Sequence, residues 1–385
     1  MKETLQLQFG AFSNGIAAEM INMEYYRSIS GDEQIDHSCF LRPLDSDPEC
    51  QVEPRVVAYD LEGNFNPGVF TSGTKYEADQ LYRDLYEPWG GIISESCGLH
   101  EHNRFRISTD DARFFTVVAD ANDYILSNES LRDDAFEPIR YQIEKYVLVV
   151  SFTNFVKGFG GLAAGALVML QDDYCRASTV QFVTFGACPH MEVAGRSLGA
   201  HDRRLSHDLN RFIAFSTLSP MSSIFIPMQS TLANDTALGV YGLGLHVNTS
   251  AYRLKDGWNA RDLFARLTTS NATLGSVLAI PLDRTFDNFQ NEPMTNDHLL
   301  FQGDRGPELG QWRSAETTFE FVNELWKKTA ELKTFLHGDH AETDHVENED
   351  LDEAAEYLSH LKADLVYYRS QHVIRTAPQI RVVHQ

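Results

Sequence analysis

The sequence predicts an α/β fold built on a mostly parallel sheet with helices on both faces. Strand-like and helix-like stretches alternate along the N-terminal half, which is typical of parallel strands joined by helical crossovers. A glycine-rich turn at 158–161 joins a buried apolar strand to a helix. The 43% of apolar residues is enough for a core of ordinary size.

The first elements follow from local periodicity. Residues 3–9 alternate polar and apolar side chains and predict a strand. Small and polar residues at 10–15 predict a loop, after which 16–21 has helical character. The run 54–61 opens with proline, is short and largely apolar, and predicts a buried strand that ends on acidic residues.

The middle of the chain continues the alternation. Residues 129–145 predict an amphipathic helix and 146–153 a fully buried strand. The helix that follows the glycine turn spans 162–174, and the next strand spans 179–186. The run 146–153 is almost continuously apolar, as expected where helices cover both faces of a sheet.

The remaining elements are less regular until the end of the chain. Residues 190–207 are polar and predict a loop with a short helix, whereas 260–268 predict a helix and 277–281 a strand. Two helices close the chain, at 317–336 and 351–368. Their apolar residues recur at helical spacing and predict one packed stripe each: Phe319, Val322, Leu325, Trp326, Leu332 and Phe335, then Leu351, Ala354, Leu358, Leu361, Leu365 and Tyr368.

Composition excludes several classes of function. The net charge of -23 repels nucleic acid and anionic lipid, so we expect no nucleic-acid partner. The five cysteines are scattered and form no CxxC pair, which indicates a reducing compartment and no zinc site. With no signal-peptide pattern and no apolar run long enough to span a membrane, we expect a cytoplasmic protein without a transmembrane segment.

The candidate site lies where strands end. Ligands of parallel sheets bind at the carboxyl ends of the strands, and the turns at 10–15, 60–63 and 158–165 meet there. Backbone N–H groups of a glycine turn at a helix N-terminus bind phosphate. The candidate ligand-binding residues are Gly10, Ser13, Asn14, Asp60, Glu62, Gly158, Gly160, Gly161 and Gly165.

Each candidate also has a purely structural reading. The glycine turn can be a tight strand-to-helix connection, Asp60 a cap of the turn after its strand, and Asn14 an N-cap. A histidine- and aspartate-rich segment at 337–345 matches no zinc spacing and is read as a solvated loop, so no metal is predicted there. Motifs of other enzyme classes are absent from the sequence.

Three of these segments resemble tubulins in the order tubulins have them. Gly10-Ala11-Phe12-Ser13-Asn14-Gly15-Ile16 resembles the tubulin loop G-Q-C-G-N-Q-I. Pro54-Arg55 with Asp60-Leu61-Glu62 resembles P-R-x-x-x-x-D-L-E. Phe159-Gly160-Gly161-Leu162-Ala163-Ala164-Gly165 resembles the phosphate turn G-G-G-T-G-S-G, but leucine and alanine stand where that turn has threonine and glycine.

Within the tubulin/FtsZ superfamily, the chain is most similar to the Misato family. The resemblance lies in segments that follow one another in the same order along the chain. They are GFGGLAAGALVMLQDDYCRAS from residue 158, RLSH at 204–207, Pro227 to Leu232, Tyr252-Arg253-Leu254 and Ala279-Ile280-Pro281-Leu282. The resemblance implies a Rossmann-like sheet domain over 1–235, a reduced α+β intermediate domain over 236–312 and a C-terminal helical hairpin within 313–385.

The resemblance also implies function. A Misato-like protein would act in mitochondrial distribution and morphology and in spindle microtubule organisation. Its expected partners are tubulin, chaperonin-type complexes and mitochondrial surface proteins, met in the cytoplasm or on the mitochondrial outer surface. The altered turn implies inefficient GTP hydrolysis and no enzymatic role, with GTP and Mg²⁺, the latter through Asp60, as the candidate cofactors.

Two alternatives stay open at this point. The chain could be a divergent GTPase that binds GTP and polymerises, or a tubulin-folding accessory. In tubulins an acidic residue of the neighbouring subunit completes hydrolysis, and Asp262 in Gly257-Trp258-Asn259-Ala260-Arg261-Asp262 is the similar position, displaced by one residue. Its structural reading is an acidic residue in the first turn of a helix.

Overall fold

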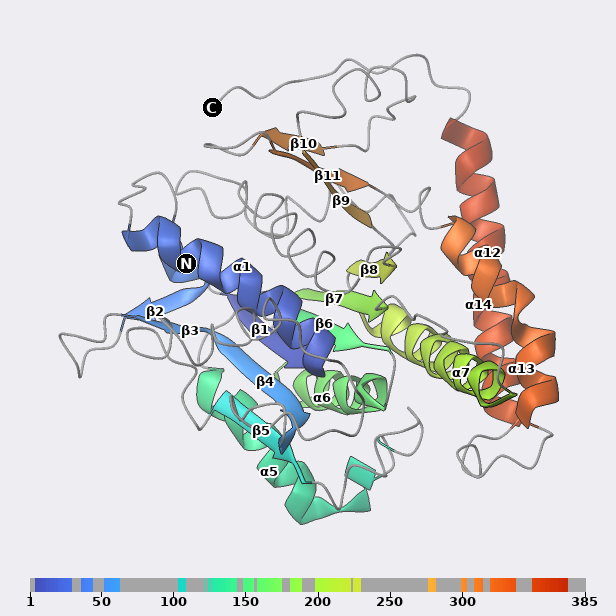
Figure 1. Cartoon of the computed structure of the whole chain (residues 1–385), viewed down its shortest axis with the longest axis horizontal. Helices are drawn as coiled ribbons and strands as arrows, with labels where there is room; N and C mark the ends of the chain where they lie inside the picture. Colours follow the sequence, from blue (N-terminus) through green and yellow to red (C-terminus); the bar gives the residue numbers. More distant parts are fainter. Residues whose placement is uncertain are drawn as a thin grey trace.

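A computed structural model shows a six-stranded, fully parallel sheet with helices packed on both faces (Figure 1). The described residues are 4–29, 36–43, 52–62, 103–108, 121, 124–125, 127–143, 148–155, 158–174, 181–188, 198–222, 224–229, 276–281, 299–302, 308–313, 319–336 and 348–372.

The strand order of this sheet is β5-β4-β1-β6-β7-β8. Its members are β1 (Thr4–Phe9), β4 (Val56–Leu61), β5 (Arg104–Ile107), β6 (Leu148–Asn154), β7 (Gln181–Cys188) and β8 (Ile224–Gln229). Numbered among themselves along the chain, the strands run 3-2-1-4-5-6, the order of the doubly wound nucleotide-binding sheet. The prediction of a parallel α/β sheet is confirmed, and β5 and β8 are strands that the sequence pattern did not indicate.

The two faces of the sheet are covered by different helices. Tyr59 points to one face, where its hydroxyl donates to the Ala135 carbonyl in α5 (Glu129–Gln142) at 2.9 Å. Its neighbour Asp60 points to the other face and accepts from Asn14 in α1 (Ala11–Ile29). Since adjacent strand residues face opposite ways, α1 and α5 lie on opposite faces of the sheet.

The larger core lies on the α5 side. It joins β1 and β4 to α6 (Phe159–Tyr174) and α7 (Leu198–Met221), and it includes Leu5, Leu7, Phe9, Val57 and Tyr59. Phe9 stacks on Tyr59 with ring centroids 4.7 Å apart. The buried apolar residues between α1 and the sheet form no part of this cluster. They are Phe12, Ile16, Ala17, Met20 and Ile21 of α1 and Val56, Ala58 and Val150 of the sheet.

Two helices begin at residues where the sequence predicted a loop. α1 begins at Ala11, inside the expected loop 10–15, because Asn14 N–H already bonds to the Gly10 carbonyl. α7 begins at Leu198, where a loop was expected, and its buried residues include Leu205, Leu209 and Phe212. The outer face of α7 is polar, so the apolar stripe on its inner face was not recognised in the sequence.

The predicted helix at 317–336 is two helices, α12 (Phe319–Lys327) and α13 (Thr329–Leu336). The Thr329 hydroxyl donates to the Trp326 carbonyl at 2.8 Å, a local bond that competes with continuous helix. Trp326 is 40% exposed rather than part of the buried stripe, with the Lys362 ammonium 3.9 Å from its ring centroid.

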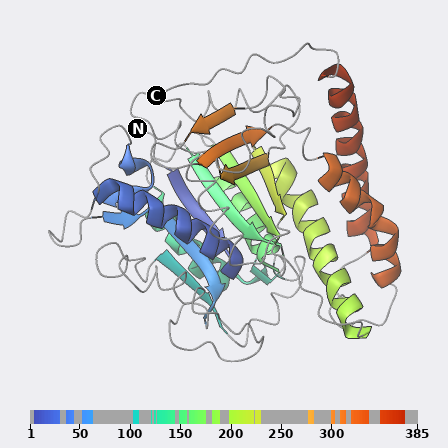
Figure 2. The same cartoon turned by 45° about the horizontal axis from the view of Figure 1, so that its top comes forward.

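The C-terminal helices pack beside α7 in both views (Figures 1 and 2). α14 (Asn348–His372) buries Leu351, Ala354, Leu358 and Leu361 as its stripe predicts. Lys328 pairs with Asp208 of α7, and the Tyr357 hydroxyl donates to Ser219 Oγ at 2.8 Å. Leu365 and Tyr368 have side chains outside the described set.

Two smaller sheets pair their strands separately from the main one. An antiparallel hairpin pairs β2 (Leu41–Pro43) with β3 (Val52–Pro54), after the short 3₁₀ helix η1 (His37–Cys39). An antiparallel sheet of order β10-β11-β9 comprises β9 (Ser276–Pro281), β10 (Leu299–Gln302) and β11 (Glu308–Arg313). β9 confirms the strand predicted at 277–281. The helix predicted at 260–268 and the segment 337–345 lie outside the described residues, and the domain boundaries at 235 and 312 stay predictions.

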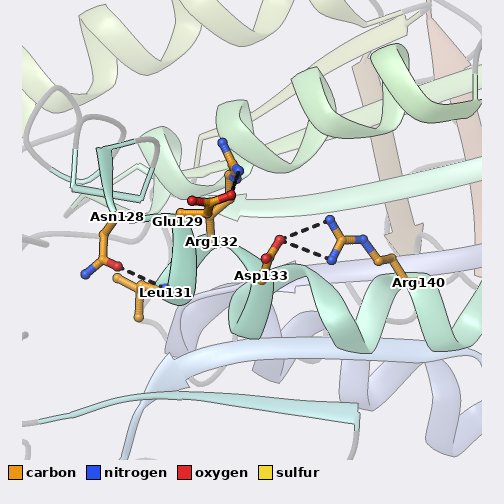
Figure 3. A network of polar contacts seen from close by, with 6 residues as sticks. All are labelled: Asn128, Glu129, Leu131, Arg132, Asp133 and Arg140. Atoms are coloured by element: carbon orange, nitrogen blue, oxygen red, sulfur yellow. Dashed lines mark hydrogen bonds and ion pairs between the residues drawn. The ribbon is translucent and has the colours of Figure 1, made fainter.

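α5 shows how local chemistry sets a helix start (Figure 3). Asn128 is the N-cap, and its Oδ1 accepts from the Leu131 N–H at 3.1 Å. Pro138 lies inside the helix and offers no N–H to the preceding turn. Arg140 spans this position by donating twice to Asp133 Oδ1, both at 3.3 Å, an exposed pair that contributes little to stability.

Tyr59→Phe is expected to lower the free energy of unfolding by about 1–2 kcal/mol at neutral pH, because the Ala135 carbonyl loses its buried donor. Burial raises the pKa of Tyr59 well above its ordinary value of 10.0. The unfolded chain therefore releases this proton first, so stability is complete below pH 10 and falls as the pH rises above it. Urea unfolding at pH 8 and pH 11 measures both effects.

The matched control is Tyr141→Phe on the same helix, where the side chain is 54% exposed. This variant should unfold like the wild type at both pH values. If Tyr59→Phe loses as much stability between pH 8 and pH 11 as the wild type does, the assignment of alkaline sensitivity to Tyr59 is wrong.

Candidate functional site

Three of the predicted turns meet at one edge of the sheet. The register aligns Phe9 of β1 with Tyr59 of β4 on one side and with Thr153 of β6 on the other. The ends of these strands are therefore level. β1 and β6 are the pair at which the strand order reverses, and ligands of doubly wound sheets bind at that switch point.

Gly10 makes the turn from β1 into α1 possible. Its φ of 88° lies in the left-handed region, which costs a residue with a Cβ atom free energy. In this conformation Gly10 N–H donates to the Tyr59 carbonyl at 2.9 Å, and the Gly10 carbonyl accepts from Asn14 N–H at 2.9 Å. The glycine thereby links the end of β4 to the start of α1.

Asn14 and Asp60 form a buried link between α1 and β4. Asn14 Nδ2 donates to Asp60 Oδ2 at 2.8 Å and to the Tyr59 carbonyl at 3.4 Å. Asp60 Oδ1 accepts from Leu61 N–H at 2.8 Å. Asn14 is 2% and Asp60 1% exposed, so this polar connection is shielded from water. It corresponds to the turn-capping reading of Asp60.

The described residues at this edge do not by themselves form a Mg²⁺ site. Mg²⁺ requires near-octahedral oxygen ligands, several of them water. Both oxygens of Asp60 already accept hydrogen bonds from the protein, and Glu62 lies past the strand end with its side chain exposed. Within the described ranges, no three acidic, histidine or cysteine residues are grouped so as to hold a metal ion.

The glycine turn closes on itself at the start of α6. Gly161 N–H donates to the Gly158 carbonyl at 2.9 Å, and Leu162 N–H donates to the same carbonyl at 3.3 Å. Leu162 and Ala163 are fully buried in the main core. These two side chains therefore contribute to packing, and the turn offers neither a hydroxyl nor those two N–H groups to a ligand. Gly160 and Gly165 are buried in the same helix.

Two polar atoms near this edge are buried without a partner in the described part of the chain. They are Ser13 Oγ and Asn14 Oδ1, in the first turn of α1. Ser13 was predicted from its place in the loop, and the structure places it in the helix next to Asn14. Of the predicted site residues, Asn14 and Asp60 are brought into contact, whereas Asp262 lies outside the described residues.

Sequence reasoning missed three residues that shape this region. Gln6 and Gln8 are the polar positions of the alternating run 3–9, and both are fully buried. Gly186 in β7 lies against the rings of Phe155 and Phe225, so that a Cβ atom there would approach within 2.4 Å of Phe155. The burial of Gln6 and Gln8 follows from the position of β1, which pairs in parallel with a strand on each side. Both faces of such a strand are buried.

The fold and its edge define an α/β protein with a parallel sheet, compatible with a Rossmann-like domain. No family model matches the chain. The chain is 22% identical over 282 residues to protein dml1 of Aspergillus oryzae, covering 59% of this chain and 54% of that protein. It therefore spans about half the length of the curated relative it matches. Because dml1 is the fungal Misato homologue, this distant similarity supports a Misato-like family.

Proposed function

We propose that the chain is a Misato-like, tubulin-related protein that acts in mitochondrial distribution and morphology and in microtubule organisation. It does so by binding other proteins rather than by efficient GTP hydrolysis. The similarity to protein dml1 supports the family-level part of this proposal. The proposal that the protein is related to tubulin is supported by the segments 10–16, 54–62 and 159–165, which occur in the same order as in tubulins. In this structure they meet at one edge of the sheet.

The burial of two side chains in the glycine turn supports the proposal that the protein does not hydrolyse GTP efficiently. The two residues that depart from the tubulin phosphate turn, Leu162 and Ala163, are fully buried in the hydrophobic core. Restoring a phosphate-contacting hydroxyl at 162 would remove apolar packing, so the departure is built into the fold. Asp60 likewise uses both carboxylate oxygens to accept from Asn14 and Leu61 N–H.

The place of action follows from the same proposal. The protein works in the cytoplasm and peripherally on the mitochondrial outer surface, with tubulin, chaperonin-type complexes and mitochondrial surface proteins as partners. No helix within the described ranges is both long and apolar enough to cross a membrane. Attachment in this proposal is through protein contacts.

A second candidate function is a divergent GTPase that binds nucleotide and polymerises. The observation that favours it is the switch point itself, where the positive-φ Gly10 and the glycine turn before α6 lie at the same edge. This geometry is the one in which backbone N–H groups and a helix N-terminus receive phosphate.

Depletion and rescue with a matched variant separate the two functions. Ser13→Ala removes a buried hydroxyl that bonds to no described group, so the fold should be retained. We expect depletion to disturb the mitochondrial network, and we expect wild type and Ser13→Ala to restore it equally. The purified protein should carry no guanine nucleotide, and GTP with Mg²⁺ should leave its melting temperature unchanged.

Opposite results would support the second function. Bound guanine nucleotide after purification, a melting temperature raised by GTP and Mg²⁺, and failure of Ser13→Ala to rescue would together contradict the non-enzymatic proposal. A normal mitochondrial network after depletion would contradict the role in mitochondrial distribution.

A further inference from the structure

The face of β1 that lies beneath α1 is polar, although it is completely buried. Thr4, Gln6 and Gln8 alternate along the strand, and each is 0% exposed. Both side-chain polar atoms of Gln6 and both of Gln8 lack a hydrogen-bond partner among the described residues. Two amide groups on one strand face are thus removed from water without compensation from the part of the protein that the structure describes.

The described neighbours of these amides on the two adjacent strands are apolar. The register places Val56 and Val150 beside Gln6, and Ala58 beside Gln8. The buried apolar residues of α1 cover this face. Such neighbours offer neither donors nor acceptors.

The polar face continues to the candidate site. Beyond Gln8 the chain turns at Gly10 into α1, whose first turn carries Ser13 Oγ and Asn14 Oδ1, also buried and without a described partner. We call Gln6, Gln8, Ser13 and Asn14 the polar seam. Its unpartnered atoms number six: two on Gln6, two on Gln8, and one each on Ser13 and Asn14.

Leaving these atoms bare is energetically excluded. A buried polar group without a partner loses its hydrogen bonds to water and gains none in return, and the sum over the whole seam would be comparable to the net stability of an ordinary domain. Buried polar groups in proteins are almost always bonded to protein or to ordered water, and one buried water makes about three hydrogen bonds to them.

We propose that the polar seam is a binding site for internal water molecules, which lie between β1 and α1 and bond to the amides of Gln6 and Gln8. With about three hydrogen bonds per water, the amide atoms and their neighbours in α1 need about two waters.

Water relaxation dispersion of the full chain tests this inference, because it counts waters with long residence times. Gln6→Met and Gln8→Met replace each amide by an apolar side chain of similar length. We expect each single variant to lose about one long-lived water and the double variant about two, relative to wild type. The matched control is Leu7→Met, on the same strand but facing the main core, which should lose none.

A crystal structure of the wild type supplies the second measurement, which does not depend on the variants folding. Ordered water within hydrogen-bond distance of Gln6 and Gln8 is expected. The proposal is overturned if both amides bond to protein groups or to each other with no water present. It is equally overturned if the methionine variants retain the full number of long-lived waters.

Discussion

Asn14→Asp is expected to lower the free energy of unfolding by about 3–5 kcal/mol at neutral pH, because it leaves two buried carboxylates facing each other without a shared donor. In the wild type these side chains are 2.8 Å apart, joined by the Asn14 amide and shielded from water. Lowering the pH should recover stability, since protonating either carboxyl restores a donor between them. Urea unfolding between pH 8 and pH 5 measures both effects.

The exchanged pair provides the control. In the double variant Asn14→Asp/Asp60→Asn the amide is on β4 and the carboxylate on α1, so one donor and one acceptor again face each other. The amide oxygen introduced on β4 can still accept from Leu61 N–H, as Asp60 Oδ1 does. We expect partial rescue, because the 3.4 Å bond from residue 14 to the Tyr59 carbonyl is lost. Equal instability of single and exchanged variants would contradict the proposed link between α1 and β4.

Gly186→Ala is expected to destabilise the protein by about 1–3 kcal/mol, the cost of overpacking a filled core. The added Cβ atom would lie 2.4 and 2.5 Å from two ring atoms of Phe155 and 2.8 Å from the ring of Phe225. The two rings stack 5.9 Å apart, and Phe215 meets Phe225 edge-on at 5.1 Å, so none can move alone. The midpoint of urea unfolding should fall without a change in slope.

Shortening the opposing side chain should relieve this clash. Phe155→Leu alone leaves a gap and costs stability, but combined with Gly186→Ala its effect should be less than additive, because the two substitutions act on the same space. Additive effects, or a stable Gly186→Ala protein, would contradict the packing described for this end of β7. Since Phe155 lies just before the glycine turn, the same variants also test whether packing around Phe155 stabilises that turn.

Much of the sheet was predictable because its pattern is local. The apolar runs that became β4, β6 and β7 and the stripe of α14 depend only on the spacing of side chains along the chain. The edge strands β5 and β8 were not predicted. β5 consists of Arg104-Phe105-Arg106-Ile107, whose charged residues are tolerated at an edge that pairs on one side only.

The candidate site was predictable in part for the same reason. The turns at strand ends mark it, so Gly10, Asn14, Asp60 and the glycines at 158–161 could be named from the sequence. Their roles depend on contacts across distant parts of the chain. Asp60 was read both as a metal ligand and as a cap, and its bonds to Asn14 and Leu61 N–H correspond to the second reading.

By itself, the sequence determined the alternation of strands and helices, the parallel sheet that follows from it, and the turns that form the candidate site at its edge. Only the tertiary structure decided the strand order that joins β1 to β4 and β6, the burial of Gln6 and Gln8, and the need for glycine at 186. The reason is physical. Periodicity is a property of neighbouring residues, whereas strand order, burial and close approach depend on residues that folding brings together.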